Sequence, residues 1–341
     1  MFSFERGIPL AVVKGGKNKN KVLRVYTEDS VNDEKKPYGR KKKVVVESES
    51  DYSDDEEDND TQMKKYEMNP ELKTLYDSDI LDEDFFKDNK INRREQDAIR
   101  KAIFTRQYSK LDIKQLEFTK RAFAYMKEKQ KKEFSCNDGE VFPVHRGGKD
   151  GMHICVVGPT GAGKSYFVAE WARNYKKIYP FNKMFLFSRK DEDDNFKSIQ
   201  GLRRIIIDEK LVEAKIDALK AFKNSLVIFD DVTMIHDKDV LAEVLHIRDD
   251  LLQNGRSYGV SVVSTHHQLQ HVGEAKLSLN ESRLVVLFPK SGAPSVNYFL
   301  EKYMALKAKD RRKLMGFPSR WICVKKDYPI VFMHQRGAYM P

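Results

Sequence analysis

The chain has 341 residues, of which 40% are hydrophobic and 33% charged, with a formal net charge of +10. This length permits one large domain or two ordinary ones. The positive charge favours an anionic partner, nucleic acid before a membrane surface. Three scattered cysteines indicate a reducing compartment and exclude a disulfide framework. Since no apolar run reaches the roughly 18 residues of a membrane span, we expect a soluble intracellular protein without a membrane span.

Residues 1–90 are predicted to form a disordered charged tail. The stretch from Lys14 to Lys43 is mostly basic, and the stretch from Glu47 to Asp60 carries nine acidic residues and no basic one. Such blocks bury too little apolar surface to offset the loss of chain entropy. A solvated tail is the favoured interpretation, and a nuclear-import or nucleic-acid contact is the alternative. We expect removal of residues 1–80 to leave the chemistry of the remaining chain largely intact.

Residues 91–147 are predicted to form a helical segment. Apolar residues recur at near-helical spacing between Asn92 and Phe134, and the pattern ends in the basic run Lys127–Lys132. The favoured interpretation is an amphipathic helical pair packed on the following domain. A dedicated DNA-binding module is the alternative.

Residues 148–341 are predicted to form an α/β P-loop NTPase domain with a mainly parallel sheet flanked by helices, because strand-like and helical stretches alternate. The expected strands are His153–Val157, Met184–Phe187, Arg204–Ile207, Leu226–Phe229, Val260–Ser264 and Leu284–Phe288. The expected helices include Glu209–Phe222, Asp239–Leu252 and Ser295–Met304. A hairpin of Trp321–Val324 and Ile330–Met333 is expected to finish the sheet.

The stretch Gly158–Ser165 fits the phosphate-binding motif G-x-x-x-x-G-K-[ST], with a buried strand before it and a helical pattern after it. Its glycines let backbone N–H groups turn inward around a triphosphate, and the following helix places its positive end under the phosphates. Lys164 is expected to reach the β- and γ-phosphates, and the Ser165 hydroxyl to bind Mg²⁺. ATP and Mg²⁺ are therefore the expected ligands. The predicted phosphate-binding residues are Gly158, Pro159, Thr160, Gly161, Ala162, Gly163, Lys164 and Ser165.

The stretch Ser225–Val232 is an apolar strand that ends in two carboxylates, the form of a Walker B segment. Asp230 is expected to hold Mg²⁺ through water. Asp231 is expected to polarise the attacking water as a general base or orienting group. Paired acids favour hydrolysis over phosphoryl transfer to another acceptor. The alternative is a pair of helix-capping or loop aspartates.

A third strand ends in polar residues at Thr265, His266 and His267. If this strand lies beside the phosphate-loop strand, Thr265 or His266 is placed to sense the γ-phosphate. A solvated pair of histidines is the alternative. Metal binding by His266, His267 and His271 lacks a supporting pattern of cysteines or carboxylates.

Together, Gly158–Ser165, Phe229–Asp231, Asn254–Gly259 and Val262–His266 resemble the poxvirus-type genome-packaging ATPases of large DNA viruses, part of the FtsK–HerA group of DNA-pumping motors. The resemblance covers roughly Gly148 to the C-terminus. It implies ATP-driven translocation of double-stranded DNA into a preformed capsid by a homo-oligomeric ring. Two departures are Ser257, where a histidine is common, and His266, where the family usually has glutamine.

The resemblance also implies an arginine that completes the active site of a neighbouring subunit. Arg256 is the first candidate, and Arg248 and Arg283 remain open. The expected catalytic set is thus Lys164, Asp231, Arg256 and His266. The implied partners are double-stranded DNA and capsid or portal-like components. The implied location is the cytoplasm, virus factory or nucleus of an infected cell, and the virion.

Other readings of the same nucleotide site stay open. A nucleoside or nucleotide kinase would need an arginine-bearing lid, which Arg311 and Arg312 could supply, and an acceptor pocket. A protein-remodelling ATPase would use much the same residues as a DNA motor. A nucleotide-dependent switch without robust turnover is the alternative outside the enzymes.

Overall fold

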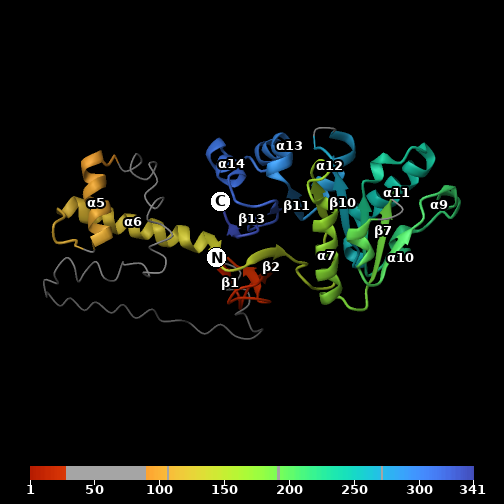
Figure 1. Cartoon of the computed structure of the whole chain (residues 1–341), viewed down its shortest axis with the longest axis horizontal. Helices are drawn as coiled ribbons and strands as arrows, with labels where there is room; N and C mark the ends of the chain where they lie inside the picture. Colours follow the sequence, from red (N-terminus) through yellow and green to blue (C-terminus); the bar gives the residue numbers. More distant parts are fainter. Residues whose placement is uncertain (28–89, 106, 190–192, 270–271) are drawn as a thin grey trace, which may run out of the picture. The chain divides into compact units, whose positions relative to one another are not determined.

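The computed structural model describes residues 1–27, 90–105, 107–189, 193–269 and 272–341 (Figure 1). The acidic block from Glu47 to Asp60 and residues 28–43 of the basic stretch lie outside these ranges. The chain divides into two compact units, one of Met1–Lys35 with Glu133–Pro341 and one of Lys36–Lys132.

The described residues of the smaller unit form two helices, α5 (Arg93–Thr105) and α6 (Ile113–Lys132). Both begin in a reciprocal capping arrangement: Asn92 exchanges hydrogen bonds with Glu95, and Asp112 with Gln115. A salt bridge of 3.0 Å between Lys114 and Glu95 joins the two helices. Their shared apolar cluster contains Ala102, Tyr108, Leu111 and Leu116. The helical pair predicted between residues 91 and 134 is therefore present.

The larger unit is built on a sheet to which the described residues contribute ten strands, in the order β4-β14-β13-β12-β11-β6-β10-β9-β7-β8. Neighbours from β11 to β8 pair in parallel, and neighbours from β4 to β11 pair antiparallel. The parallel strands are β6 (Ile154–Val157), β7 (Lys183–Ser188), β8 (Leu202–Ile205), β9 (Ser225–Asp230), β10 (Ser261–His266) and β11 (Leu284–Leu287). The others are β4 (Glu133–Ser135), β12 (Ile322–Lys325), β13 (Val331–His334) and β14 (Gly337–Tyr339). This architecture confirms the predicted mainly parallel α/β fold.

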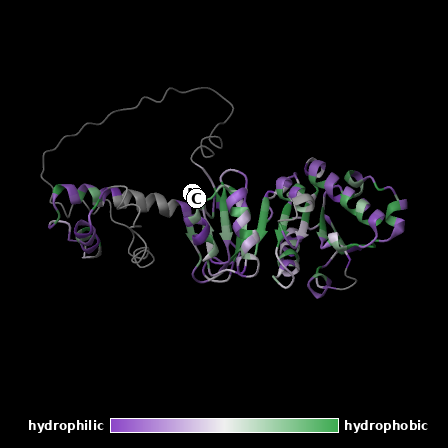
Figure 2. Ribbon diagram, turned by 90° about the horizontal axis from the view of Figure 1, so that it is seen from above, coloured by the Kyte–Doolittle hydropathy of each residue, from purple (hydrophilic) through white to green (hydrophobic). Residues whose placement is uncertain are grey.

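Helices cover both faces of this sheet, whose strands are the most hydrophobic part of the unit (Figure 2). Alternate residues of each strand point to opposite faces, so β9 sends Leu226 and Ile228 to one apolar cluster and Val227 and Phe229 to another. The first cluster contains α7 (Lys164–Ile178). The opposite face is covered by α11 (Lys238–Asn254), α12 (Val272–Glu281), α13 (Pro289–Lys302) and α14 (Ala308–Met315). The remaining short helices are α8 (Asp194–Lys197), α9 (Glu209–Glu213), α10 (Ala218–Ala221), η1 (Val232–Met234) and η2 (Gly255–Tyr258).

The N-terminal residues form part of the folded unit. Strands β1 (Phe2–Ser3), β2 (Ile8–Lys14) and β3 (Val22–Val25) make an antiparallel sheet with β5 (Glu140–Pro143). Leu10 and Val13 are buried in the same cluster as α7, and Lys14 forms a 2.7 Å ion pair with Glu170 of that helix. The prediction of a disordered tail is therefore wrong for residues 1–27. The charged blocks dominate the composition of residues 1–90, so the apolar pattern of the short strands β2 and β3 was not recognised in the sequence.

Two further predictions differ from the structure. The stretch Glu209–Phe222 is two short helices, because Lys215 adopts a left-handed conformation (φ 42°) and Asp217 caps the second helix. The predicted terminal hairpin is present as β12 and β13, and the sheet continues beyond it through β14 to β4. Residues 133–143, which belong to the segment predicted as helical, thus contribute the strands β4 and β5. Among the described residues, no helix combines the length and apolar composition that crossing a bilayer requires.

Candidate active site

The phosphate loop joins β6 to α7 at the edge where the parallel strands end. Gly161 (φ 77°) and Gly163 (φ 105°) take left-handed conformations that a side chain would strain. At Gly158, an added Cβ would lie 2.8 Å from a ring carbon of Phe288, so packing requires the glycine. The first turn of α7 carries no acidic side chain. The loop therefore fits a phosphate group at the positive end of the helix.

The Lys164 side chain is 6% exposed and lies over this loop. Its ammonium group donates hydrogen bonds to the carbonyl oxygens of Gly158 (2.9 Å) and Pro159 (3.5 Å). It also lies 3.8 Å from Oδ1 of Asp231. The structure thus brings the predicted phosphate-binding lysine and the predicted water-polarising acid together, although 67 residues separate them in the sequence.

The two acids are linked through the strand that lies between them and the phosphate loop. Strand β10 pairs with β6 on one side and β9 on the other, so Thr265 sits between the loop and the acids. The Thr265 hydroxyl lies 3.0 Å from Oδ1 of Asp230 and 3.2 Å from Oδ1 of Asp231, and it accepts a hydrogen bond from the Asp231 N–H (2.9 Å). The condition set for a role of Thr265, that its strand lies beside the phosphate-loop strand, is met, and Thr265 contacts both carboxylates.

Asp231 occupies an uncommon backbone conformation. Its φ of 51° and ψ of 34° lie in the left-handed region, which costs a residue with a Cβ about 1 kcal/mol or more. Aspartate and asparagine tolerate this region better than other residues. The left-handed turn at Asp231 directs its carboxylate toward Lys164. The strained backbone conformation is therefore part of the geometry of the site.

His267 is a site residue that the sequence analysis did not select. Its Nδ1 lies 3.3 Å from Nζ of Lys164, and its Nε2 lies 3.2 Å from Oδ1 of Asp231. The ring thus lies between the two groups, with one nitrogen facing the ammonium group of Lys164 and the other facing the carboxylate of Asp231. His267 is the first residue after β10, so its place at the polar end of this strand was the one sequence signal that pointed to it.

His266 lies in a different environment. Its side chain is 5% exposed, and its Nε2 has no hydrogen-bond partner among the described residues. Burial lowers the pKa of this imidazole to about 3, with a further contribution from the positive charge of Arg248. The ring is therefore neutral. The structure gives contacts with Lys164 and Asp231 to His267, while His266 contributes its backbone carbonyl to the Gly158 N–H (3.0 Å).

The three candidate arginines differ in exposure and position. Arg248 is 3% exposed and pairs with Asp249 at 2.8 Å, and Arg283 pairs with Asp327. Arg256 is exposed on η2, directly before β10, whereas the phosphate loop follows the C-terminal end of the neighbouring parallel strand β6. Arg256 thus lies where the parallel strands begin, and the phosphate loop lies where they end. Arg256 therefore has no access to the nucleotide site of its own subunit.

The predicted Mg²⁺ ligands are oxygen atoms, which suit a hard cation. Ser165 is the second residue of α7, and Asp230 is buried at the end of β9 with its carboxylate 3.0 Å from the Thr265 hydroxyl. In the described part of the chain, no three His, Cys, Asp or Glu side chains gather around a metal position. Mg²⁺ takes few protein ligands and completes its shell with phosphates and water.

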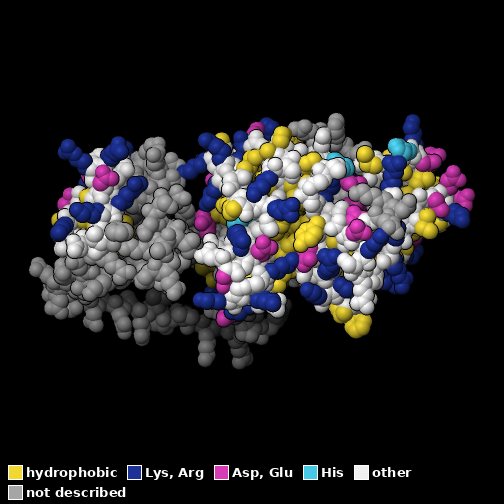
Figure 3. All heavy atoms as spheres, in the orientation of Figure 1, with side chains coloured by type: hydrophobic (Ala, Val, Ile, Leu, Met, Phe, Trp, Pro, Cys, Tyr) yellow, Lys and Arg dark blue, Asp and Glu magenta, His cyan; other side chains and the backbone are white. Residues whose placement is uncertain are grey.

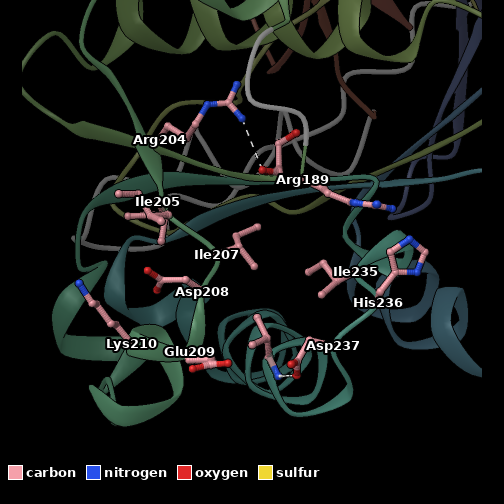
Figure 4. Close-up of a pocket in the computed structure, with 13 residues that line it drawn as sticks. Arg189, Arg204, Ile205, Ile207, Asp208, Glu209, Lys210, Ile235, His236 and Asp237 are labelled. Atoms are coloured by element: carbon pink, nitrogen blue, oxygen red, sulfur yellow. Dashed lines mark hydrogen bonds between the residues drawn. The ribbon is translucent and has the colours of Figure 1, made fainter.

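A cavity of about 600 Å³ opens at the same edge of the sheet, beyond the ends of β7 and β8 (Figure 4). Apolar Ile205, Ile207 and Ile235 line it together with charged residues such as Arg189 and Asp208. It adjoins the acid pair, because Ser188 at its wall is the register partner of Asp230. The cavity has room for a small molecule or a peptide segment beside the acids.

Comparison with known proteins finds a relative of this chain in a virophage. No protein-family profile matches it. The chain is 35% identical over 187 residues to a protein of Sputnik virophage that carries the name "Uncharacterized protein V3", covering 54% of this chain and 75% of that protein. The chain belongs to the same family as this V3 protein.

Two solved structures are similar to parts of this chain. The genome packaging NTPase B204 from Sulfolobus turreted icosahedral virus 2, in complex with AMPPCP, is 15% identical, with 55% of this chain and 98% of that chain covered and a TM-score of 0.38. The cytoplasmic domain of the type VII secretion ATPase EccC from Thermomonospora curvata is 14% identical, with 60% of this chain and 28% of that chain covered and a TM-score of 0.40.

Proposed function

We propose that this chain is an ATPase that translocates double-stranded DNA, with the packaging of a viral genome as its task. The observation that carries the proposal is the meeting of the Lys164 ammonium group, the Asp231 carboxylate and the His267 ring within 4 Å of one another at the phosphate loop. A loop shaped for phosphates, and an acid pair at the end of the next strand but one with Asp230 buried and Asp231 half-buried, are the two halves of a nucleotide-hydrolysing site.

Each half of the site performs a different part of the chemistry. The loop N–H groups and Lys164 bind and orient the phosphates of ATP, and Lys164 neutralises charge that develops on the γ-phosphate. Asp231 orients the attacking water and accepts its proton. Thr265 keeps this carboxylate in place. In this scheme Lys164 exchanges its contacts with loop carbonyls and His267 for contacts with phosphate oxygens.

Mg²⁺ would be held by Ser165 and, through water, by Asp230, and when bound it neutralises charge on the phosphates. Asp230 is suited to this role because its carboxylate sits at the end of a fully buried strand and is fixed by Thr265. The donor set of hydroxyl and carboxylate oxygens is the one that Mg²⁺ prefers.

The viral setting of the proposal rests on the V3 relative and on the motifs that resemble packaging ATPases. Membership of the FtsK–HerA group, action on DNA, contact with capsid or portal-like components and a location in an infected cell are parts of this proposal. Arg256 supports a ring, because an exposed arginine on the edge opposite the nucleotide site reaches a nucleotide only in a neighbouring subunit.

The test is steady-state hydrolysis of ATP by the wild type and by Asp231→Asn, with and without long double-stranded DNA over a salt series. We expect DNA to stimulate the wild type in a salt-sensitive way, and the substitution to lower kcat by about 10²- to 10⁴-fold. Asp194→Asn is the matched control, since this side chain is 97% exposed and paired with Lys197 at the surface. Hydrolysis that ignores DNA, or that survives Asp231→Asn, contradicts the proposal.

A phosphotransferase is the second candidate, because the cavity beyond β7 and β8 offers an acceptor pocket beside the acid pair. The two functions differ in products. An ATPase releases inorganic phosphate in an amount equal to ADP, whereas a kinase produces ADP with little free phosphate when its acceptor is present. Hydrolysis stimulated by an unfolded protein instead of DNA would support a protein-remodelling ATPase.

A further inference from the structure

A second cleft lies at the N-terminal ends of the parallel strands, whereas the phosphate loop lies at their C-terminal ends. It has a volume of about 450 Å³ and is formed where the segments before β6, β9 and β10 meet the end of α7. Strand β10 separates the two edges, and its six residues span roughly 17–20 Å, so this cleft is distinct from the nucleotide site. We call it the basic cleft. Its lining includes Lys149, Lys223, Asn182, Asn224, Ser257, Tyr179 and Tyr258.

Close backbone contacts hold the segments of the basic cleft together. The Gly151 N–H donates to the Arg256 carbonyl at 2.9 Å, and the Asn224 N–H donates to the Tyr258 carbonyl at 3.0 Å. An added Cβ at Gly151 would lie 1.7 Å from the Val260 carbonyl oxygen, so only glycine permits this approach. The absence of a side chain at Gly259 (φ 72°) likewise leaves room for the Asn224 side chain. The cleft is therefore formed in advance of any ligand.

The polar groups of the basic cleft are mainly donors. Lys149 and Lys223 are exposed, and neither has a carboxylate partner within the described ranges. The acid in the lining, Asp150, is 61% exposed and is paired with Arg146 at 3.1 Å. Tyr258 is 41% exposed at the rim. Lys and Arg side chains also surround the lower end of α7 in Figure 3.

Further positive charge lies next to the basic cleft. Arg283 stands at the same edge, where its N–H donates to the His153 carbonyl (2.9 Å) just before β6. Burial lowers its pKa, and the nearby positive charges of Arg146 and Arg256 lower it further, against the opposing effect of Asp327. Arg283 is paired with Asp327 and Arg146 with Asp150, so within the described ranges the lysines of the cleft, Lys149 and Lys223, carry the positive charge that has no carboxylate partner.

We propose that the basic cleft binds the sugar-phosphate backbone of duplex DNA. Lysine, asparagine, serine and tyrosine side chains are the groups that contact backbone phosphates in protein–DNA complexes, and they carry no sequence information. A motor must hold its track without preference for sequence, and this lining suits that need. The inference rests on the proposed function. It gives that function a track-binding site on the side of the sheet opposite the nucleotide.

The test measures the affinity of the full chain, without nucleotide, for two fluorescent 30-base-pair duplexes of unrelated sequence over a salt series. Lys149→Glu/Lys223→Glu is compared with Lys19→Glu/Lys307→Glu, which makes the same charge change at exposed lysines elsewhere. We expect the cleft variant to lose at least about tenfold in affinity for both duplexes, and the slope of log K against log salt to fall by about 2. We expect the control to retain the wild-type slope.

ATP hydrolysis without DNA separates this inference from the proposed function. We expect the cleft variant to keep the basal rate, because neither lysine contacts the phosphate loop, and to lose stimulation by DNA. Equal losses in the cleft and control variants, or no loss in either, overturn the inference while leaving the ATPase in place. Tighter binding of a single-stranded RNA probe than of either duplex overturns the choice of partner. A wild type without hydrolysis refutes the proposed function itself.

Discussion

At the scale of single residues, the site depends on a histidine that bridges a cation and an anion. The His267 ring contacts Nζ of Lys164 with one nitrogen and the Asp231 carboxylate with the other. It therefore holds both groups in position before the nucleotide arrives. Its position lets it respond when Lys164 moves to a phosphate. We regard it as a positioning residue, because its contacts are with the two groups to which the proposed function assigns the chemistry of ATP hydrolysis.

We expect His267→Ala to lower kcat for ATP hydrolysis by about 10-fold to 10²-fold, because Asp231 and Lys164 lose their common support. His267→Gln should recover part of this loss, since an amide can accept from Lys164 and donate to Asp231. His246→Ala on the exposed side of α11 is the matched control. Steady-state kinetics measures the effect. An unchanged kcat in His267→Ala would remove His267 from the site.

At the scale of secondary-structure elements, the N-terminal strands belong to the main core. Leu10 and Leu23 are 2% and 1% exposed and share a cluster with α7, the helix that starts at Lys164. The ion pair between Lys14 and Glu170 connects β2 directly to that helix. The earlier expectation that residues 1–80 are dispensable therefore does not hold for the first 27 of them, because their removal would expose the packed face of α7.

We expect Leu10→Ala to lower the free energy of unfolding by about 2–5 kcal/mol, as for other fully buried leucines. Urea denaturation followed by circular dichroism measures this change. Lys19→Ala in the exposed turn between β2 and β3 is the control and should change stability by less than about 0.5 kcal/mol. A similarly small effect of Leu10→Ala would mean that the strands are not part of the cooperative fold.

At the scale of the whole molecule, buried neutral histidines make stability depend on pH. Burial lowers the pKa of His145 and His266 to about 3 and that of His153 and His334 to about 4. Nearby positive charges add to the effect, Arg146 at His145 and Lys313 at His334. In the unfolded chain these rings have a pKa near 6.5. Between pH 6.5 and about 4, the unfolded state therefore binds more protons than the folded state.

It follows that stability is highest above pH 6.5 and falls as the pH drops through this window, by up to about 1.4 kcal/mol per pH unit for each histidine. We expect the midpoint of urea unfolding to fall clearly between pH 7.0 and 5.5. His334→Gln should reduce the slope by about one proton, with His246→Gln as the exposed control. A midpoint independent of pH in this range would show that these rings are accessible to protons in the folded state.

Much of the site was predictable from local sequence. The phosphate loop, the acid pair after an apolar strand and the mainly parallel sheet follow from glycine spacing, hydrophobic runs and alternation of elements, all of which act over a few residues. These features are encoded locally because each depends on backbone conformation and side-chain period.

The tertiary structure alone decided which side chains meet. Contacts between Lys164, Asp231 and His267 depend on the order of strands in the sheet and on a left-handed turn at Asp231, and strand order is set by packing across the whole unit. Packing against a distant helix also placed residues 1–27 in the core despite their charged neighbours. The basic cleft forms where three chain segments approach one another closely at glycine residues. Such contacts are set by long-range packing, so the local sequence pattern does not predict them.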